Sequence, residues 1–117
     1  MIYCAEHYST AMLEKLVHGS GQMPPDQHSV EITIPPGVTY EQVTVHHLRH
    51  WDNPDRRVSR DFGEQWFIEQ RSLFLLVPSV VARMERNVLI NPFHPGFGKV
   101  TQGLAEPVRW DERLFSV

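Results

Sequence analysis

The sequence of 117 residues lacks the features that mark several large classes of protein. Its one cysteine, Cys4, cannot form an internal disulfide, which excludes a secreted disulfide-rich scaffold. Its longest purely apolar run, residues 73–77, is far too short to cross a bilayer. Neither a G-x-G-x-x-G motif nor a Walker loop occurs, so Rossmann and P-loop nucleotide binding have no support.

Positive charge is scarce in the first part of the chain, where Lys15 is the only lysine or arginine before Arg49. The net charge is −3 and no basic stripe with interleaved aromatic residues occurs, so we expect no direct nucleic-acid binding. Residues 1–6 lack the basic region of a signal peptide, so we expect a cytoplasmic protein without membrane contact. A composition of 41% hydrophobic and 21% charged residues is typical of one globular domain, here residues 1–117.

Hydrophobic periodicity, capping residues and turns predict an irregular alternation of short strands and helices. Helices are predicted over residues 11–17, 39–47 and 59–70, with N-caps at Ser9 or Thr10, at Thr39 within a capping box, and at Ser59. Strands are predicted over residues 2–5, 29–34, 72–77, 86–90 and 108–110. Because these strands are short and bounded by prolines, we expect an α+β fold rather than a doubly wound parallel sheet.

The seven histidines raise the question of a metal site. His46 and His50 would face the same way on a helix, which is a metal-ligand spacing. The glutamate of H-E-x-x-H is absent, however, and Arg49 and Arg57 nearby would oppose a cation. We therefore expect no metal site.

Read one at a time, the remaining polar residues have ordinary structural explanations. Ser79 is a turn or capping hydroxyl, because residues 77–81 do not form the G-x-S-x-G elbow of a serine nucleophile. Glu14, taken alone, is interpreted as a solvent-exposed charge on a helix. Tyr3 is interpreted as an aromatic core residue whose hydroxyl is hydrogen-bonded. Cys4 points to the opposite strand face from Tyr3, as a buried and inert thiol. Composition and spacing alone therefore indicate an α+β domain and no function.

Read together and in order, six stretches of the chain resemble the RES domain, a family named for its arginine, glutamate and serine. The resemblance covers nearly the whole chain, and the order and spacing of its motifs make it specific. The stretches are Ile2-Tyr3-Cys4-Ala5-Glu6, residues 11–18, Gly63-Glu64-Gln65-Trp66, Val77-Pro78-Ser79, residues 87–95 and residues 111–115.

The resemblance implies a fold like that of ADP-ribosyltransferases, with short mixed sheets and a few helices. It implies a toxin of a bacterial type II toxin–antitoxin system that consumes NAD⁺ by cleaving the nicotinamide–ribose bond. The acceptor stays open between water, phosphate and a protein side chain, and NAD⁺ is a substrate, with no cofactor implied. The implied partner is an Xre-like antitoxin with a helix-turn-helix domain, in a homo-oligomer or in a hetero-oligomer with that antitoxin.

By the same resemblance, the family's glutamate corresponds to Glu14, its serine to Ser79, and the aromatic residue of its first core strand to Tyr3. Cleavage of the nicotinamide–ribose bond develops oxocarbenium character on the ribose. A carboxylate at Glu14 would accept a ribose hydroxyl and stabilise that charge. Tyr3 would stack on the nicotinamide ring. Ser79 would hydrogen-bond the ribose or the amide of nicotinamide.

The sequence departs from the family in its arginine, which the resemblance places upstream of the strand that holds Tyr3. No arginine occurs before Arg49 in this chain, and Arg83 and Arg86 are poor substitutes. We therefore expect an N-terminal strand and arginine segment to be missing, which would leave the edge of residues 2–5 unpaired and prone to self-association. Two interpretations stay open: an NAD⁺-consuming toxin, or a catalytically inactive RES remnant that only binds its antitoxin.

Overall fold

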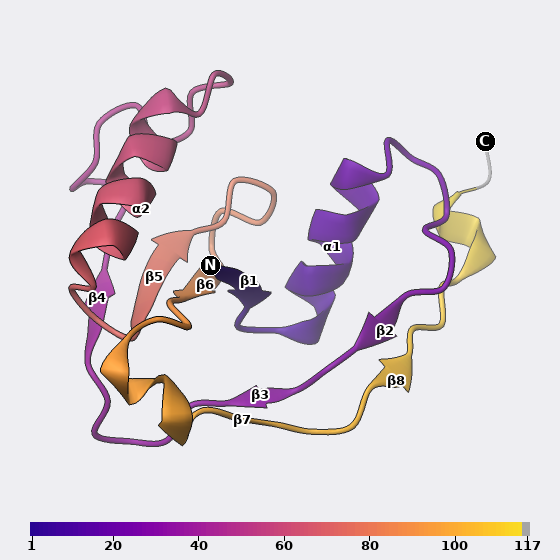
Figure 1. Cartoon of the computed structure of the whole chain (residues 1–117). Coiled ribbons are helices and arrows are strands. Elements are labelled where there is room, and N and C mark those ends of the chain that lie inside the picture. The colour runs from indigo at the N-terminus through magenta and orange to yellow at the C-terminus, as the bar shows by residue number, and fades with distance from the viewer. Residues whose placement is uncertain (116–117) are drawn as a thin grey trace.

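A mixed four-stranded sheet forms the centre of the computed structural model, which describes residues 1–115 (Figure 1). From one edge of the sheet to the other, the first two neighbouring pairs of strands are antiparallel and the third pair is parallel. In spatial order the strands are β1 (Ile2–Ala5), β6 (Arg86–Ile90), β5 (Phe74–Pro78) and β4 (Tyr40–Gln42).

Two α-helices and two small antiparallel ribbons complete the fold, which is α+β as the sequence predicts. The helices are α1 (Tyr8–His18) and α2 (Arg57–Glu69), with 3-10 turns η1 (Pro95–Lys99) and η2 (Glu112–Leu114). One ribbon pairs β2 (His28–Ser29) with β8 (Glu106–Pro107), and the other pairs β3 (Ile32–Thr33) with β7 (Thr101–Gln102). No helix within residues 1–115 has the length and apolar character that crossing a membrane requires.

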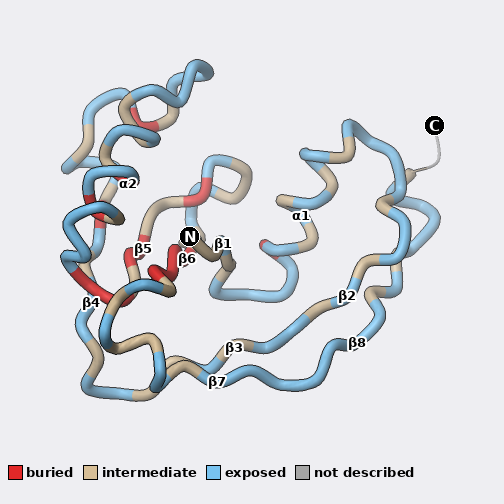
Figure 2. Tube along the Cα trace, viewed as in Figure 1, coloured by how far each residue is buried: buried red, intermediate tan, exposed pale blue. Residues whose placement is uncertain are grey.

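The buried residues gather around β5, β6 and α2, whereas α1 and the ribbons are mostly exposed or half-buried (Figure 2). On one face of the sheet, the completely buried Trp66 of α2 packs with Val43, Leu75 and Leu89. The indole Nε1 of Trp66 donates to Ser72 Oγ at 2.8 Å, which satisfies the ring's polar atom inside the core. A second cluster fills the other face, with Leu73, Leu76, Val88 and Ile90 at its centre.

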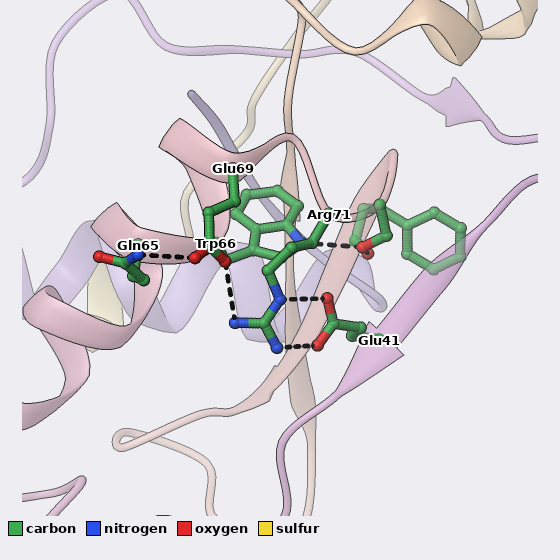
Figure 3. A network of polar contacts seen from close by, with 7 residues as sticks. Glu41, Gln65, Trp66, Glu69 and Arg71 are labelled. Carbon is green, nitrogen blue, oxygen red and sulfur yellow. Dashed lines mark hydrogen bonds and ion pairs between the residues drawn. The ribbon is translucent and has the colours of Figure 1, made fainter.

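The helix predicted over residues 39–47 is wrong, because this segment contains β4. Tyr40 pairs with Phe74 and stacks on its ring at 5.1 Å, and Val43 joins the core. Glu41, on this strand, accepts hydrogen bonds from Nε and Nη2 of Arg71, which lies just after α2 (Figure 3). Pairing with β5 and burial of Val43 therefore outweigh the local capping signal.

The predicted strand over residues 108–110 is also wrong, and the strand predicted over residues 29–34 is not continuous. The last strand is β8, and Val108 only donates its N–H to the carbonyl of Gln27. The strand predicted over residues 29–34 is broken into β2 and β3, because its two ends pair with different strands, β8 and β7.

Neither α-helix is capped by the predicted hydroxyl residue. Helix α1 begins one turn earlier than expected, after His7, so Ser9 and Thr10 lie inside it and the Thr10 side chain is buried. Helix α2 begins after Arg56, and Ser59 donates to the carbonyl of Trp51 instead of capping the helix. The Thr10 side chain therefore serves packing, and the Ser59 hydroxyl attaches a loop to the helix. Local sequence signals do not distinguish these roles from capping.

The contrast between core and surface leucines provides a stability test. Leu75 of β5 is completely buried in the cluster with Trp66 of α2, whereas Leu104 is 90% exposed. We expect Leu75→Ala to lower the free energy of unfolding by about 2–5 kcal/mol, because the core loses methyl groups and keeps part of the cavity. We expect the control Leu104→Ala to change it by less than about 0.5 kcal/mol. Urea denaturation followed by circular dichroism measures both, and equal effects would contradict this core.

Candidate functional site

Glu14 and Ser79, which lie 65 positions apart in the sequence, are joined by a hydrogen bond. The Ser79 hydroxyl donates to Glu14 Oε1 at 3.2 Å. Glu14 is half-buried on α1, and Ser79 is completely buried directly after β5. The fold therefore brings together two of the three residues that the sequence predicts for the site.

Ser79 is held in place by the continuation of the central strand pair. Its N–H donates to the carbonyl of Glu85 at 3.0 Å, which extends the β5–β6 ladder one residue beyond the Pro78–Arg86 pair. Its Oγ also accepts the N–H of Ala82 at 3.0 Å. The hydroxyl therefore closes the turn between the strands, as a serine in a turn commonly does, and uses its own proton for Glu14.

Asn87 is a further member of the cluster that the sequence reasoning did not single out. It lies on β6 opposite Val77, and its Nδ2 donates to the same Glu14 Oε1 at 3.1 Å. The other amide atom, Oδ1, is buried and has no hydrogen-bond partner among residues 1–115. The available signal was a polar residue at the start of an otherwise apolar strand, within the stretch of residues 87–95 that resembles the family.

The two oxygens of the Glu14 carboxylate differ in their hydrogen bonding, because Ser79 and Asn87 both donate to the same one. Oε1 accepts from Ser79 and Asn87, whereas Oε2 accepts from no residue within the described part of the chain. A carboxylate has about four lone-pair positions, so Oε2 retains its capacity to accept from a ligand hydroxyl. The arrangement fixes the carboxylate through one oxygen and offers the other.

Tyr3 lies on the same sheet face as Asn87. Among residues 1–115, Tyr3 makes no hydrogen bond to Glu14. The register pairs Tyr3 with Leu89 and Ala5 with Asn87, so Tyr3 and Asn87 are diagonal neighbours, typically about 7–8 Å apart. The Tyr3 side chain is 75% exposed. It is therefore not a core residue, and its ring is open to a ligand beside the cluster.

Cys4 faces the opposite side of the sheet from Tyr3, as alternation along the strand predicts. It packs against the cluster that contains Val88 and is half-buried. Burial raises the pKa of the Cys4 thiol above its usual range. The thiol is therefore removed from the Glu14 cluster and weakly reactive at neutral pH.

The arginines nearest to Ser79 in the sequence are engaged elsewhere. Arg86 Nε lies 2.5 Å from Glu6 Oε1, and Arg83 Nη1 lies 2.9 Å from Asp52 Oδ2. The Arg83 guanidinium also covers the Trp51 ring at 5.7 Å. Neither side chain reaches Glu14 among the ion pairs of the described residues.

His46 and His50, the pair with a metal-ligand spacing, lie in turns, since the predicted helix around His46 does not form. Across residues 1–115, no three histidine, cysteine, aspartate or glutamate side chains are grouped closely enough to hold a metal ion.

Comparison with known proteins gives one family and several named relatives. A family model described as "RES domain" matches residues 1–111. The chain is 44% identical over 100 residues to "Prs ADP-ribosylating toxin" of Sphingobium sp. (strain YBL2), over 81% of the chain and 62% of that protein. It is 31% identical over 104 residues to "Toxin Res" of Photorhabdus laumondii subsp. laumondii, over 84% of the chain and 64% of the relative.

A third relative, "Toxin Res" of Yersinia enterocolitica, is 33% identical over 98 residues, with 82% of the chain and 64% of the relative covered. The chain thus spans 62–64% of the length of these three proteins.

The half-buried thiol provides a test of the β1 placement. Because the thiolate is the reactive form, a raised pKa predicts slow alkylation of Cys4 at pH 7.5 and a rate that keeps rising above pH 9. Iodoacetamide labelling followed by mass spectrometry measures this rate. The same chain unfolded in guanidinium serves as the control, and equal rates in the two states would contradict the burial of Cys4.

Proposed function

Because the chain belongs to the RES domain family, we propose that it acts as an NAD⁺-consuming toxin of a bacterial type II toxin–antitoxin system. The observation that carries this proposal is the Ser79–Glu14 hydrogen bond, since the resemblance assigns the family's serine and glutamate to these two residues. The toxin names of the relatives, one of them an ADP-ribosylating toxin, support the same assignment.

The proposed reaction breaks the bond between nicotinamide and the ribose C1′. The bonding electron pair leaves with nicotinamide, which departs as a neutral molecule, so a strong general acid is not required. The remaining ribose carries oxocarbenium character, which a nearby carboxylate stabilises. Glu14 does this through Oε2, which also accepts a ribose hydroxyl, while Ser79 and Asn87 hold Oε1.

The acceptor of the ADP-ribosyl group determines the product. Water forms the new C1′–O bond, loses a proton to solvent and gives free ADP-ribose. Inorganic phosphate gives a phosphorylated ADP-ribose, and a protein side chain gives an ADP-ribosylated protein. Tyr3 assists each route equally, because its exposed ring stacks on nicotinamide, which is worth about 0.5–1.5 kcal/mol beyond the buried area.

We further propose that residues 1–117 belong to a single RES domain, which works in the cytoplasm, where its substrate NAD⁺ is available. Its proposed partner is an Xre-like helix-turn-helix antitoxin, which keeps the toxin inactive in a hetero-oligomer.

A catalytically inactive RES domain that only binds an antitoxin is the second candidate. It is favoured by the pairing of Arg83 with Asp52 and of Arg86 with Glu6, which leaves neither guanidinium available for the diphosphate of NAD⁺. A charge-assisted hydrogen bond of that kind is worth about 1.5–3 kcal/mol, so its loss weakens binding by about ten- to a hundredfold. An activity measurement decides between the two candidates.

The decisive substitution is Glu14→Ala. We expect the purified chain to release nicotinamide from NAD⁺, and Glu14→Ala to lower the rate at least about a hundredfold without unfolding the domain, because the developing charge loses its stabiliser. Chromatography of nicotinamide and ADP-ribose products over time gives the rate and identifies the acceptor. Glu64→Ala, an exposed glutamate on α2, is the matched control.

The outcomes of this assay separate the candidates. A folded Glu14→Ala variant with an unchanged rate would remove Glu14 from its proposed role. No turnover by the folded original chain would favour the binding domain over the toxin.

Asn87 is expected to position the carboxylate of Glu14. Asn87→Ala removes one charge-assisted donor, so we expect kcat to fall about ten- to a hundredfold with little change in KM. Asn87→Asp keeps the shape of the side chain but places a negative charge against Glu14, and we expect a larger loss of kcat. A purely structural role predicts the opposite order, with the isosteric Asn87→Asp milder than Asn87→Ala, and steady-state kinetics distinguishes the two.

A further inference from the structure

The turn between β5 and β6, residues 79–85, carries Ser79 but has no apolar anchor beyond it. Ser79 is completely buried, whereas none of residues 80–85 is buried, and Met84 is 98% exposed. Burial of side chains therefore does not fix the path of the turn after Ser79. Its position depends on its hydrogen bonds and on the polar contacts that its side chains make.

Two charged side chains attach the turn to the segments that lead into the two α-helices (Figure 1). Glu85 Oε2 lies 2.7 Å from Nδ1 of His7, the residue directly before α1. Arg83 Nη1 lies 2.9 Å from Oδ2 of Asp52, which belongs to the loop before α2. The turn is thus tied on one side to the helix that carries Glu14, and on the other side to the loop before α2.

The attachment through Arg83 has a firmer base than an isolated surface ion pair. The Arg83 guanidinium also covers the ring of Trp51, with its Cζ 5.7 Å from the ring centroid, and Trp51 is only 8% exposed. The carbonyl of Trp51 accepts the hydroxyl of Ser59, which fixes this part of the loop to α2. A cation over a partly desolvated aromatic face is attracted to it in addition to the carboxylate. Arg83 therefore joins the exposed turn to a buried part of the loop.

The residue anchored in this way is next to the group that orients Ser79. The N–H of Ala82, the residue before Arg83, donates to Ser79 Oγ at 3.0 Å. With one lone pair engaged by this N–H, the hydroxyl directs its proton to Glu14 Oε1 at 3.2 Å. Without the anchor, Ala82 would move with the turn, and the hydroxyl would be free to rotate away from Glu14.

We propose that Arg83 is a positioning residue for Ser79. It does not touch NAD⁺. It holds the turn so that Ala82 orients the Ser79 hydroxyl, which in turn holds Oε1 of Glu14. The effect of Arg83 on a reaction rate rests on the proposed function. The role also explains why this guanidinium is engaged by Asp52 and is not available to the substrate.

Steady-state kinetics of NAD⁺ cleavage tests this role. We expect Arg83→Ala to lower kcat about three- to tenfold and to change KM by less than about twofold, because the lost contacts orient the hydroxyl and do not bind substrate. Arg83→Lys keeps the charge without the planar guanidinium, so it should retain at least about half of the original kcat. Arg109→Ala is the matched control, because Arg109 is exposed and takes part in no ion pair among residues 1–115.

Two kinetic results would overturn the positioning role. A higher KM of Arg83→Ala with an unchanged kcat would place the guanidinium on the substrate. An unchanged kcat with a lower free energy of unfolding would show that Arg83 only stabilises the fold.

Substitution of the partner carboxylate checks that the two residues act together. Asp52→Asn removes the charge that holds the guanidinium and leaves the ring contact, so we expect kcat to fall about two- to fivefold. In the Arg83→Ala background the same substitution should have no further effect, because its partner is already absent. Additive losses in the double variant would contradict a shared role.

Amide hydrogen exchange measures the anchoring without any activity. Arg83→Ala should speed exchange of the Ala82 N–H about three- to tenfold, because the turn opens more often. The N–H of Asn91, which donates to the carbonyl of Leu73 at the opposite end of the β5–β6 pair, is the internal control and should be unchanged.

The exchange result separates this proposal from the proposed function. Unchanged exchange at Ala82 would refute the anchoring by Arg83, whatever the activity. Faster exchange in a chain that shows no turnover would support the anchoring and would count against the proposed function alone.

Discussion

Antiparallel pairing of β5 with β6 is the interaction on which both cores and the candidate site depend. The pair supplies Leu75 and Leu89 to the cluster under α2, and Leu76 and Val88 to the cluster on the other face. The same ladder continues to Ser79 and thereby sets its distance from Asn87, which pairs with Val77. A slip of one residue would turn these polar side chains away from Glu14 and expose the core at the same time. Stability and site geometry are therefore fixed by one register.

The parts of the fold that the sequence predicts are those in which local pattern and burial agree. The apolar run before Pro78 and the strand from Arg86 to Ile90 occur as predicted, and α2 lies within two residues of its expected start. The failures lie where distant partners decide. Tyr40 and Glu41 become part of a strand because Phe74 contacts the first and Arg71 the second from another part of the chain, and no local signal reports these contacts. The broken strand around Val30 has the same cause, since its ends pair with two separate segments.

The candidate site shows a similar division. Spacing alone assigned Glu14 and Ser79 to ordinary surface and turn roles, and only the family resemblance joined them across 65 positions. Asn87 was missed because an asparagine at the start of a strand has no distinctive spacing, and its role follows from a contact with a helix 73 positions away. Tyr3 was expected in the core when read alone, yet it lies exposed because β1 is an edge strand. Contacts between distant residues thus carry most of the information about this site.

The double engagement of the Ser79 hydroxyl has a consequence for chemical probes. Its proton is donated to Glu14, one lone pair accepts the Ala82 N–H, and the side chain is completely buried. Acylating or phosphonylating reagents that label nucleophilic serines need an accessible oxygen and a base that withdraws its proton during attack. Such reagents meet neither an exposed oxygen nor a spare lone pair directed outward here. An inhibitor for this fold is better designed as a hydrogen-bond donor to the open oxygen of Glu14, with an aromatic group for the ring of Tyr3.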